Sequence, residues 1–433
     1  MMQVLNDLKS GKLKGSKTLK LSCGLTTFPE EILTLASTLE VLDLSDNNLS
    51  TLPDSIAELK QLRIIFFARN KFTEFPSVLA KCPNLNMVGF KTNQIKKVPE
   101  HAFPPKLNWL ILTDNKIKKL PKSIGNSTWL QKCALAGNLI EELPVEMSNC
   151  VNLELLRVSA NQLKTIPNWL FELPKLSWVA FGGNPAAYQI TKKNNLESFF
   201  WQDFKVKELL GEGASGFIYK ANWISKNQDV AIKVFKGAVT SDGLPEVEME
   251  IAIAAGNHQN LIPILGKIKE HPEDKSGLVM QLITSNYINL GNPPSLKTCT
   301  RDTFNASCTF TEKELLSIGK SIASVCQQLH RKGINHGDLY AHNILINSNA
   351  ESLLGDFGAA SFYNVNTTTA KNIERVEVRA YGCLLEDIFN LVDKTKLNNA
   401  SIIKWQELIE NCTIPNVKKR FNFSEISETL NAF

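Results

Sequence analysis

An asparagine that recurs every 22 or 23 residues is the feature that most limits how this chain can fold. The positions are Asn47, Asn70, Asn93, Asn115, Asn138, Asn161 and Asn184. A proline stands six residues after each of the first six, at Pro53, Pro76, Pro99, Pro121, Pro144 and Pro167. A fixed period of this length indicates a solenoid, in which each unit buries its apolar residues only by stacking on its neighbours.

Leucines hold fixed places before each asparagine. Leu39, Leu42 and Leu44 precede Asn47 in the pattern L-x-x-L-x-L-x-x-N. In such a unit a short strand lines a concave face, and the asparagine side chain can bond backbone groups of the turn that lack other partners. The pattern resembles the leucine-rich repeat and predicts seven to eight repeats within residues 1–187.

The strand residues that face outwards on the concave side include several large apolar side chains. An exposed apolar stripe suggests a surface that binds a protein partner or substrate. The alternative is that the linker or a second domain folds back and covers it. The residues expected on the binding surface are Ile64, Phe66, Met87, Trp109, Ile111, Leu155 and Trp178.

Composition and charge exclude several other classes of protein. The net charge of +5 over 433 residues is small and spread out, which argues against a nucleic-acid binder. No apolar run approaches the 18 residues of a membrane span, and the first residues lack the apolar core of a signal peptide. The nine cysteines form no C-x-x-C pair, so we expect reduced thiols and a cytoplasmic protein.

After a linker expected at residues 188–203, the second half opens with a glycine-rich stretch, GEGASG, that begins at Gly211. In a dinucleotide-binding site a helix would start there. Here Phe217, Ile218 and Tyr219 continue as a strand, which favours a hairpin whose backbone N–H groups can approach phosphates. Lys233, in VAIKVF, follows Gly216 by seventeen residues and matches the strand lysine that pairs with nucleotide phosphates.

Two further motifs complete the set. His336-Gly337-Asp338-Leu339 and Asn343 keep the D-x-x-x-x-N spacing of a base and a metal ligand. Asp356-Phe357-Gly358, eighteen residues beyond Asp338, supplies a second metal-binding side chain. Phosphoryl transfer needs such parts because cations must offset the charge on the transferring group while a carboxylate orients the attacking hydroxyl.

Together these motifs resemble a eukaryotic-type protein kinase domain over residues 204–433, and the whole chain resembles the leucine-rich-repeat-containing protein kinases. The resemblance implies an α/β leucine-rich-repeat solenoid followed by a bilobal α+β kinase-like domain that uses ATP and Mg²⁺. It implies Asp338 as catalytic base, Glu248 or else Glu250 as the partner of Lys233, with Glu248 preferred, and Asn343 and Asp356 as metal ligands. The implied ATP-binding residues are Leu210, Gly211, Glu212, Gly213, Ala214, Ser215, Gly216, Ile218, Ala231, Lys233, Met280, Gln281 and Ile283.

The chain departs from the family pattern at four places. Gly337 replaces the arginine that usually pairs with a phosphate on the activation loop, and Tyr340 replaces the lysine two residues after the base in serine/threonine kinases. No A-P-E triplet follows Gly358, and Glu377 resembles a substitute for the aspartate that opens the next helix. Arg420 resembles the arginine that normally pairs with the glutamate of the missing triplet, so its partner is open.

These departures leave three functions to weigh. The first is an ATP-dependent protein kinase, with serine/threonine preference, whose repeats recruit a partner or substrate. A pseudokinase scaffold that binds ATP without transferring phosphate is the second. The third is a small-molecule phosphotransferase. The H-G-D-L motif resembles that class, whereas the glycine-rich loop, V-A-I-K and D-F-G argue against it.

Overall fold

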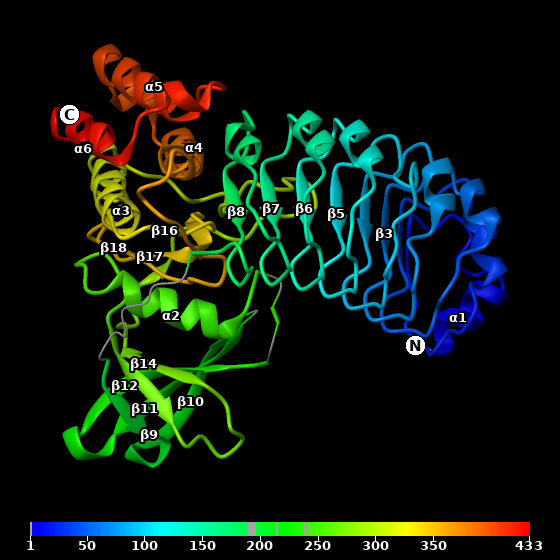
Figure 1. Cartoon of the computed structure of the whole chain (residues 1–433), viewed down its shortest axis with the longest axis horizontal. Coiled ribbons are helices and arrows are strands. Elements are labelled where there is room, and N and C mark those ends of the chain that lie inside the picture. The colour runs from blue at the N-terminus through cyan, green and yellow to red at the C-terminus, as the bar shows by residue number, and fades with distance from the viewer. Residues whose placement is uncertain (1, 189–195, 214, 238, 241) are drawn as a thin grey trace. The chain divides into compact units, whose positions relative to one another are not determined.

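The computed structural model describes residues 2–188, 196–213, 215–237, 239–240 and 242–433, and the chain divides into two compact units (Figure 1). The first unit comprises Met1–Leu173 and Asn184–Ala186, and the second comprises Pro174–Gly183 and Ala187–Phe433. Ala214, expected to bind ATP, lies outside the described residues, as does the stretch 189–195 of the expected linker.

The first unit repeats a three-residue strand followed, in most repeats, by a short 3₁₀ helix (Figure 1). Its strands are β1 (Thr18–Lys20), β2 (Val41–Asp43), β3 (Ile64–Phe66), β4 (Met87–Gly89), β5 (Trp109–Ile111), β6 (Lys132–Ala134) and β7 (Leu155–Arg157). Its helices are α1 (Met2–Lys9), η1 (Glu30–Leu35), η2 (Asp54–Glu58), η3 (Ser77–Lys81), η4 (Lys122–Asn126), η5 (Val145–Asn149) and η6 (Asn168–Glu172). Successive strands pair in parallel and in register, as the repeat pattern predicts.

The middle residue of each strand points into the solenoid core. From β2 to β7 these residues are Leu42, Ile65, Val88, Leu110, Cys133 and Leu156, all at most 1% exposed. Because side chains alternate along a strand, the residues on either side of them face the opposite surface of the sheet. Stacked repeats thus bury together what one repeat could not bury alone.

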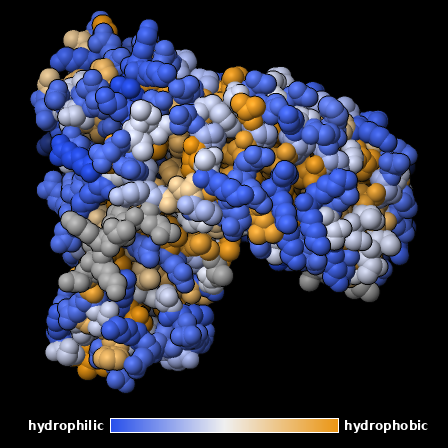
Figure 2. Space-filling model, viewed as in Figure 1, coloured by the Kyte–Doolittle hydropathy of each residue, from blue (hydrophilic) through white to orange (hydrophobic). Residues whose placement is uncertain are grey.

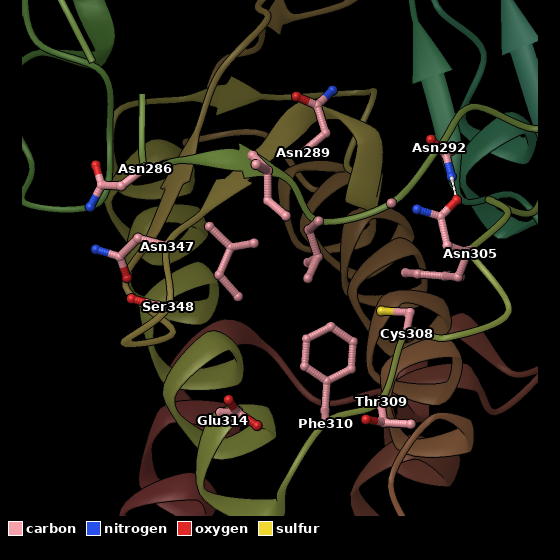
Figure 3. Close-up of a pocket in the computed structure, with 15 residues that line it drawn as sticks. Asn286, Asn289, Asn292, Asn305, Cys308, Thr309, Phe310, Glu314, Asn347 and Ser348 are labelled. Atoms are coloured by element: carbon pink, nitrogen blue, oxygen red, sulfur yellow. Dashed lines mark hydrogen bonds between the residues drawn. The ribbon is translucent and has the colours of Figure 1, made fainter. Parts of the chain in front are cut away.

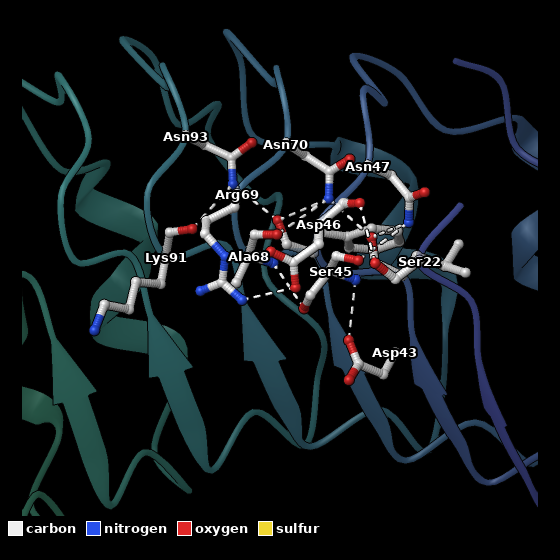
Figure 4. A network of polar contacts seen from close by, with 12 residues as sticks. Ser22, Asp43, Ser45, Asp46, Asn47, Ala68, Arg69, Asn70, Lys91 and Asn93 are labelled. Carbon is white, nitrogen blue, oxygen red and sulfur yellow. Dashed lines mark hydrogen bonds and ion pairs between the residues drawn. The ribbon is translucent and has the colours of Figure 1, made fainter. Parts of the chain in front are cut away.

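The recurring asparagines form a ladder along the turn that follows each strand (Figure 4). The Asn70 Nδ2 donates to the backbone oxygens of Leu44, 2.9 Å away, and Phe67, 3.2 Å away. Its Oδ1 accepts the backbone N–H of Leu49 at 2.9 Å. Each such side chain therefore ties its own turn to the preceding repeat, which satisfies backbone groups that would otherwise be buried without partners.

The outward-facing strand residues differ in how much of them solvent reaches. Ile64, Phe66, Trp109 and Ile111 are partly exposed, whereas Met87 and Leu155 are 7% and 4% exposed. Figure 2 shows hydrophobic residues interspersed with hydrophilic ones along the repeats on the face in view. The apolar stripe expected from the sequence is therefore only partly open to solvent.

The smaller lobe of the second unit is a six-stranded sheet with one helix. The strand order is β10-β11-β12-β14-β13-β9, with all pairs antiparallel except β13 and β9. The elements are β9 (Ser198–Phe200), η7 (Trp201–Asp203), β10 (Phe204–Glu212), β11 (Gly216–Trp223), η8 (Ile224–Lys226), β12 (Gln228–Phe235), α2 (Pro245–Ala255), β13 (Ile264–Lys269) and β14 (Gly277–Gln281). Phe199, Phe204 and Trp223 anchor its core, so part of the segment expected as a linker belongs to this sheet.

The larger lobe is mainly helical, and with the smaller lobe it gives the bilobal kinase fold that the sequence predicts. Its elements are β15 (Ile288–Asn289), α3 (Glu312–Arg331), β16 (Ile334–Asn335), η9 (Ala341–Asn343), β17 (Ile344–Ile346), β18 (Ser352–Leu354), β19 (Ser361–Phe362), α4 (Ala370–Asn390), η10 (Lys394–Lys396), α5 (Asn399–Thr413), η11 (Val417–Lys419) and α6 (Phe423–Asn431). A further short strand of the second unit, β8 (Trp178–Ala180), comes from the last repeat of the sequence pattern.

Candidate active site

The glycine-rich stretch forms the hairpin between β10 and β11. The Gly213 N–H donates to the Gly216 oxygen at 2.9 Å. A Cβ on Gly216 would lie 2.5 Å from the Val234 oxygen, so only glycine lets the hairpin pass this close to β12. Leu210, Glu212 and Gly213 are exposed, whereas Ser215 and Gly216 are buried. The glycine-rich stretch thus forms a strand–turn–strand hairpin held close to β12, not the start of a helix.

Lys233 of β12 forms an ion pair with Glu248 of α2. The side chain of Lys233 is 12% exposed and that of Glu248 is 4% exposed, whereas Glu250 is exposed. Burial lowers the pKa of Lys233, but the charges of Glu248 and Asp356 outweigh burial and raise the pKa above its usual value. The lysine is therefore held charged inside the lobe.

Asp356 adds a second carboxylate to this cluster. Its backbone has a φ of 53°, and the Gly358 N–H donates to its Oδ1 at 3.1 Å. Burial raises the pKa of Asp356, but the Lys233 charge and the Gly358 N–H outweigh burial and lower the pKa below its usual value. This carboxylate, on a residue that is exposed to solvent, is thus kept ionised.

The loop from β16 to β17 holds the predicted base and the predicted amide ligand together. The Asn343 Nδ2 donates to the backbone oxygen of Asp338 at 2.9 Å and to its Oδ2 at 2.8 Å. The His336 ring lies 2.9 Å from the Gly355 oxygen and packs against Phe357 at 5.2 Å between ring centroids. The loop with the base and the loop with Asp356 are therefore joined directly.

Glu377 of α4 forms hydrogen bonds to the backbone of the same loop. Its carboxylate accepts the N–H groups of His336 at 3.1 Å and Gly337 at 2.7 Å, and His330 Nε2 lies 2.8 Å away. Burial raises the pKa of Glu377, but the bond to His330 outweighs burial and lowers the pKa. Glu377 does not open its helix as expected from the sequence, since α4 already begins at Ala370. Its carboxylate reaches the loop from inside the helix.

Met280, Gln281 and Ile283, which are expected to bind ATP, lie at or just after the end of β14. Met280 pairs with Ala231 in the sheet register, and the Gln281 N–H already donates to the Pro263 oxygen at 2.9 Å. Because this donor is used within the protein, an adenine would have to bond the Gln281 oxygen or backbone groups of the next residues, which include Ile283. The sequence pattern could not resolve this distinction.

Trp178 departs from the expected binding surface. It is 2% exposed, and its ring stacks on Tyr340 with centroids 4.5 Å apart and planes 7° from parallel. Trp178 is therefore buried within the second unit. Arg420, 1% exposed, donates to the carbonyl oxygens of Pro174, Arg375 and Ile414, and among the described residues it forms no ion pair with a carboxylate.

A separate cavity of about 370 Å³ lies beside β15, and Lys233 is not among the residues that line it (Figure 3). Asparagine side chains surround it together with Phe310 and Glu314, and Asn292 bonds Asn305 at 3.2 Å. It contains none of the motif residues named above. Within the described residues no group of three or more His, Cys, Asp and Glu side chains could hold a metal ion. None of the helices described combines the length and hydrophobicity needed to cross a bilayer.

Sequence reasoning missed the residues that bond only to backbone groups. Asn335 donates to the Val179 oxygen, and Ser361 Oγ accepts the N–H groups of Phe181 and Gly182. No motif marks such residues, because their partners are carbonyl and amide groups that every sequence has. The only available signal was Gly337, an unexpected glycine beside the base.

Comparison with known proteins agrees with this geometry. A protein kinase domain model matches residues 204–382, and a leucine-rich repeat model matches residues 38–59. The chain is 26% identical over 261 residues to a probable LIM domain-containing serine/threonine-protein kinase of Dictyostelium discoideum, a match that covers 52% of this chain and 38% of the relative. It is 31% identical over 170 residues to the serine/threonine-protein kinase PLK4 of Drosophila yakuba, covering 37% and 20%.

A third relative is also a probable serine/threonine-protein kinase. Identity is 25% over 162 residues with a probable serine/threonine-protein kinase of Arabidopsis thaliana, covering 37% of this chain and 21% of the relative. The chain thus spans between 20% and 38% of the length of these three relatives.

Proposed function

Because the chain carries a protein kinase domain together with leucine-rich repeats, we propose that it transfers phosphate from ATP to serine or threonine hydroxyls of a protein. The observation that carries this proposal is the ion pair between Lys233 and Glu248, formed next to the ionised Asp356. A lysine and a glutamate that are both largely buried are costly to keep in a fold unless their charges serve each other or a ligand.

The catalytic loop supports the same chemistry. In the proposed reaction the substrate hydroxyl oxygen attacks the γ-phosphorus, the bond to the bridging oxygen of ADP breaks, and Asp338 accepts the hydroxyl proton. Asn343 holds the Asp338 carboxylate through its Oδ2, which fixes the orientation of the base. Lys233 would offset charge on the phosphates of the nucleotide.

The donor set fits a magnesium ion bound together with a nucleotide. Mg²⁺ prefers oxygen ligands and usually takes only one or two protein carboxylates, with phosphates and water completing its shell. Asp356 supplies an ionised carboxylate and Asn343 an amide oxygen. When bound, Mg²⁺ would neutralise charge on the phosphates.

The test compares the purified full chain with matched variants in an assay with labelled ATP and Mg²⁺. Asp338→Asn is expected to lower incorporation of phosphate by about 100-fold or more, because a positioned general base contributes about 10²–10⁴-fold. Glu248→Gln is expected to reduce transfer strongly. Glu250→Gln, two residues away on the same helix and exposed, serves as the control and should retain the wild-type rate.

A pseudokinase scaffold remains the second candidate because Tyr340 stands where a lysine is usual and is only 5% exposed. A phenol brings no positive charge to the site. Nucleotide binding by the wild-type chain without transfer to any protein would favour this candidate and would refute the proposed transfer.

We further propose that the repeats recruit the protein partner or substrate. Ile64, Phe66, Trp109 and Ile111 remain partly exposed, and Lys132 lies 4.2 Å from the centroid of the Trp109 ring. Aromatic side chains are enriched at protein interfaces, and tryptophan is among their commonest hot spots. Phe66→Asp should then reduce phosphorylation of the recruited substrate while leaving phosphorylation of a generic peptide unchanged. Equal loss on both substrates would contradict recruitment.

A further inference from the structure

The segment Pro174–Gly183, which we call the repeat-end segment, belongs to the same compact unit as the kinase domain. By sequence it is the strand region of the last repeat, with Trp178 six residues before Asn184. Its strand β8 carries the side chain that departs most from the expected exposed surface. Several of its contacts fall on or next to the catalytic loop.

Trp178 and Val179 contact this loop directly. The Trp178 Nε1 donates to the Leu339 oxygen at 3.0 Å, and the indole ring stacks on Tyr340. On the next residue, the Val179 oxygen accepts the Asn335 Nδ2 at 2.9 Å. Asp338 therefore lies between two loop positions, Asn335 and Leu339, that are both bonded to the repeat-end segment.

The same segment is also fixed to the stretch that follows Gly358. The N–H groups of Phe181 and Gly182 both donate to the Ser361 Oγ, at 2.9 and 3.0 Å. Ser361 lies in β19, which pairs with β16 immediately before the catalytic loop. The repeat-end segment thus bonds both strands of this small sheet, since Asn335 lies in β16.

Two arginines of the larger lobe hold the beginning of the segment. The Arg420 guanidinium donates to the Pro174 oxygen at 2.6 Å, and Arg379 donates to the Ser177 Oγ at 2.8 Å. Hydrogen bonds from charged donors are stronger than those between neutral groups. The segment is therefore bonded at its start, its middle and its end.

Gly337 explains why this contact is possible. Its φ is 72°, and a Cβ at this position would lie 2.5 Å from the Val179 oxygen and 2.7 Å from the Ala359 oxygen. Any side chain would meet backbone on both sides, so the arginine usual at this position cannot be accommodated. The repeat-end segment can therefore lie this close to the catalytic loop only because glycine replaces the usual arginine.

We propose that the repeat-end segment positions the catalytic loop, and that Trp178 is the positioning residue through which it acts on Asp338. This inference rests on the proposed kinase activity, because positioning has a consequence only if phosphate is transferred. Trp178 touches no reacting atom in this scheme. It holds Leu339 and Tyr340, which follow Asp338 directly.

The kinetic test uses Trp178→Ala and Trp178→Phe in the full chain, with Trp129→Ala as the control, since Trp129 is 64% exposed. Because misplacing a catalytic group by about 1 Å can cost about 100-fold, Trp178→Ala should lower kcat by about that factor. The Kd for ATP should stay within about twofold, because the nucleotide contacts lie elsewhere. Trp178→Phe keeps a ring to stack and should recover part of kcat. A kcat equal to that of the wild type in Trp178→Ala would overturn the proposal.

A second measurement is independent of catalysis. Amide hydrogen exchange of residues 334–343 should become faster in Trp178→Ala, while exchange in α6 and in the Trp129→Ala control stays unchanged. If the wild-type chain transfers no phosphate, the proposed function fails, and this exchange result still decides whether the segment holds the loop. If Trp178→Ala does not fold, Ser361→Ala removes the two bonds to Phe181 and Gly182 at the loss of a single buried hydroxyl. Unchanged exchange of the loop in the folded variants would refute the positioning role.

Discussion

The strands β5 and β8 begin with tryptophans at the same place in the repeat, six residues before Asn115 and Asn184. Trp109 on β5 is partly exposed, its indole N–H has no hydrogen-bond partner within the described part of the chain, and Lys132 lies over its ring. Trp178 on β8 is buried, bonds the Leu339 oxygen and stacks on Tyr340. The repeat pattern therefore fixes the backbone position of such a residue but not its role.

The largest expected effect comes from removing β8 altogether. A fragment of residues 187–433 keeps β9 and the whole kinase domain but lacks the repeat-end segment, whereas a fragment of residues 174–433 contains it. We expect the shorter fragment to unfold at a lower temperature and to transfer no phosphate, because Tyr340 loses the ring of Trp178 and Arg420 loses the Pro174 oxygen. Thermal unfolding and labelled-ATP assays of both fragments test this. Equal melting temperatures would show that β8 is as dispensable to the kinase domain as β5.

The next largest effect is expected from a substitution at Gly337, where β8 lies close to the catalytic loop. Gly337→Arg restores the usual kinase residue but places a Cβ against two carbonyl oxygens in a left-handed backbone conformation. We expect a loss of about 1–3 kcal/mol from backbone strain alone, with further loss from the clash. Urea unfolding and kcat of the full chain measure it.

Gly237→Ala is the matched control, since its Cβ would meet nothing within 4 Å. A Gly337→Arg chain with normal stability and normal kcat would show that β8 does not need this glycine.

Truncating the two tryptophans compares the strands directly. Trp178→Ala should lower the free energy of unfolding by about 3–5 kcal/mol, the range for fully buried large aromatic residues. Trp109→Ala should cost less, about 1–2 kcal/mol, because its ring is only partly buried. Urea unfolding of the two variants measures the loss of stability. Because each variant removes a tryptophan, unfolding of each unit is followed by amide exchange and not by tryptophan fluorescence. Equal costs would remove the contrast between the strands.

Glu377 tests the other side of the catalytic loop by its pH dependence. Its pKa is lowered below 4.5 in the folded chain, so the stability it contributes is present above about pH 4.5 and is lost as the pH falls through the folded-state pKa. Glu377→Gln should cost about 1.5–3 kcal/mol at pH 7, the range for a hydrogen bond to a charged group. The difference from wild type should shrink below pH 4.5 in urea unfolding. A difference that is constant down to pH 3 would show that the Glu377 charge is not involved.

Much of this arrangement could be predicted from the sequence, and the reasons for the remainder are physical. The asparagine period and the ordered kinase motifs are local patterns with fixed spacing, so the repeats, the two lobes and the kinase domain followed from them. The bond of Trp178 to the Leu339 oxygen and that of Arg420 to the Pro174 oxygen join residues 161 and 246 positions apart, and both are made to backbone groups. Gly337 indicates that another part of the backbone approaches the catalytic loop closely, but the sequence does not identify that segment.

The smallest expected effect concerns the threonines before α4. Thr367 and Thr368 are exposed, and the stretch from Gly358 to Ala370 is short and is fixed by β19 and by the Tyr363 N–H, which donates to the Gly333 oxygen at 2.8 Å. The arginine that would bind a phosphate here is replaced by Gly337, and β8 already holds the loop. Changing Thr367, Thr368 and Thr369 together to Ala should therefore leave kcat within about twofold, since surface changes away from packed features are nearly neutral. A large fall in kcat would mean that phosphorylation of this stretch, and not β8, sets the position of Asp338.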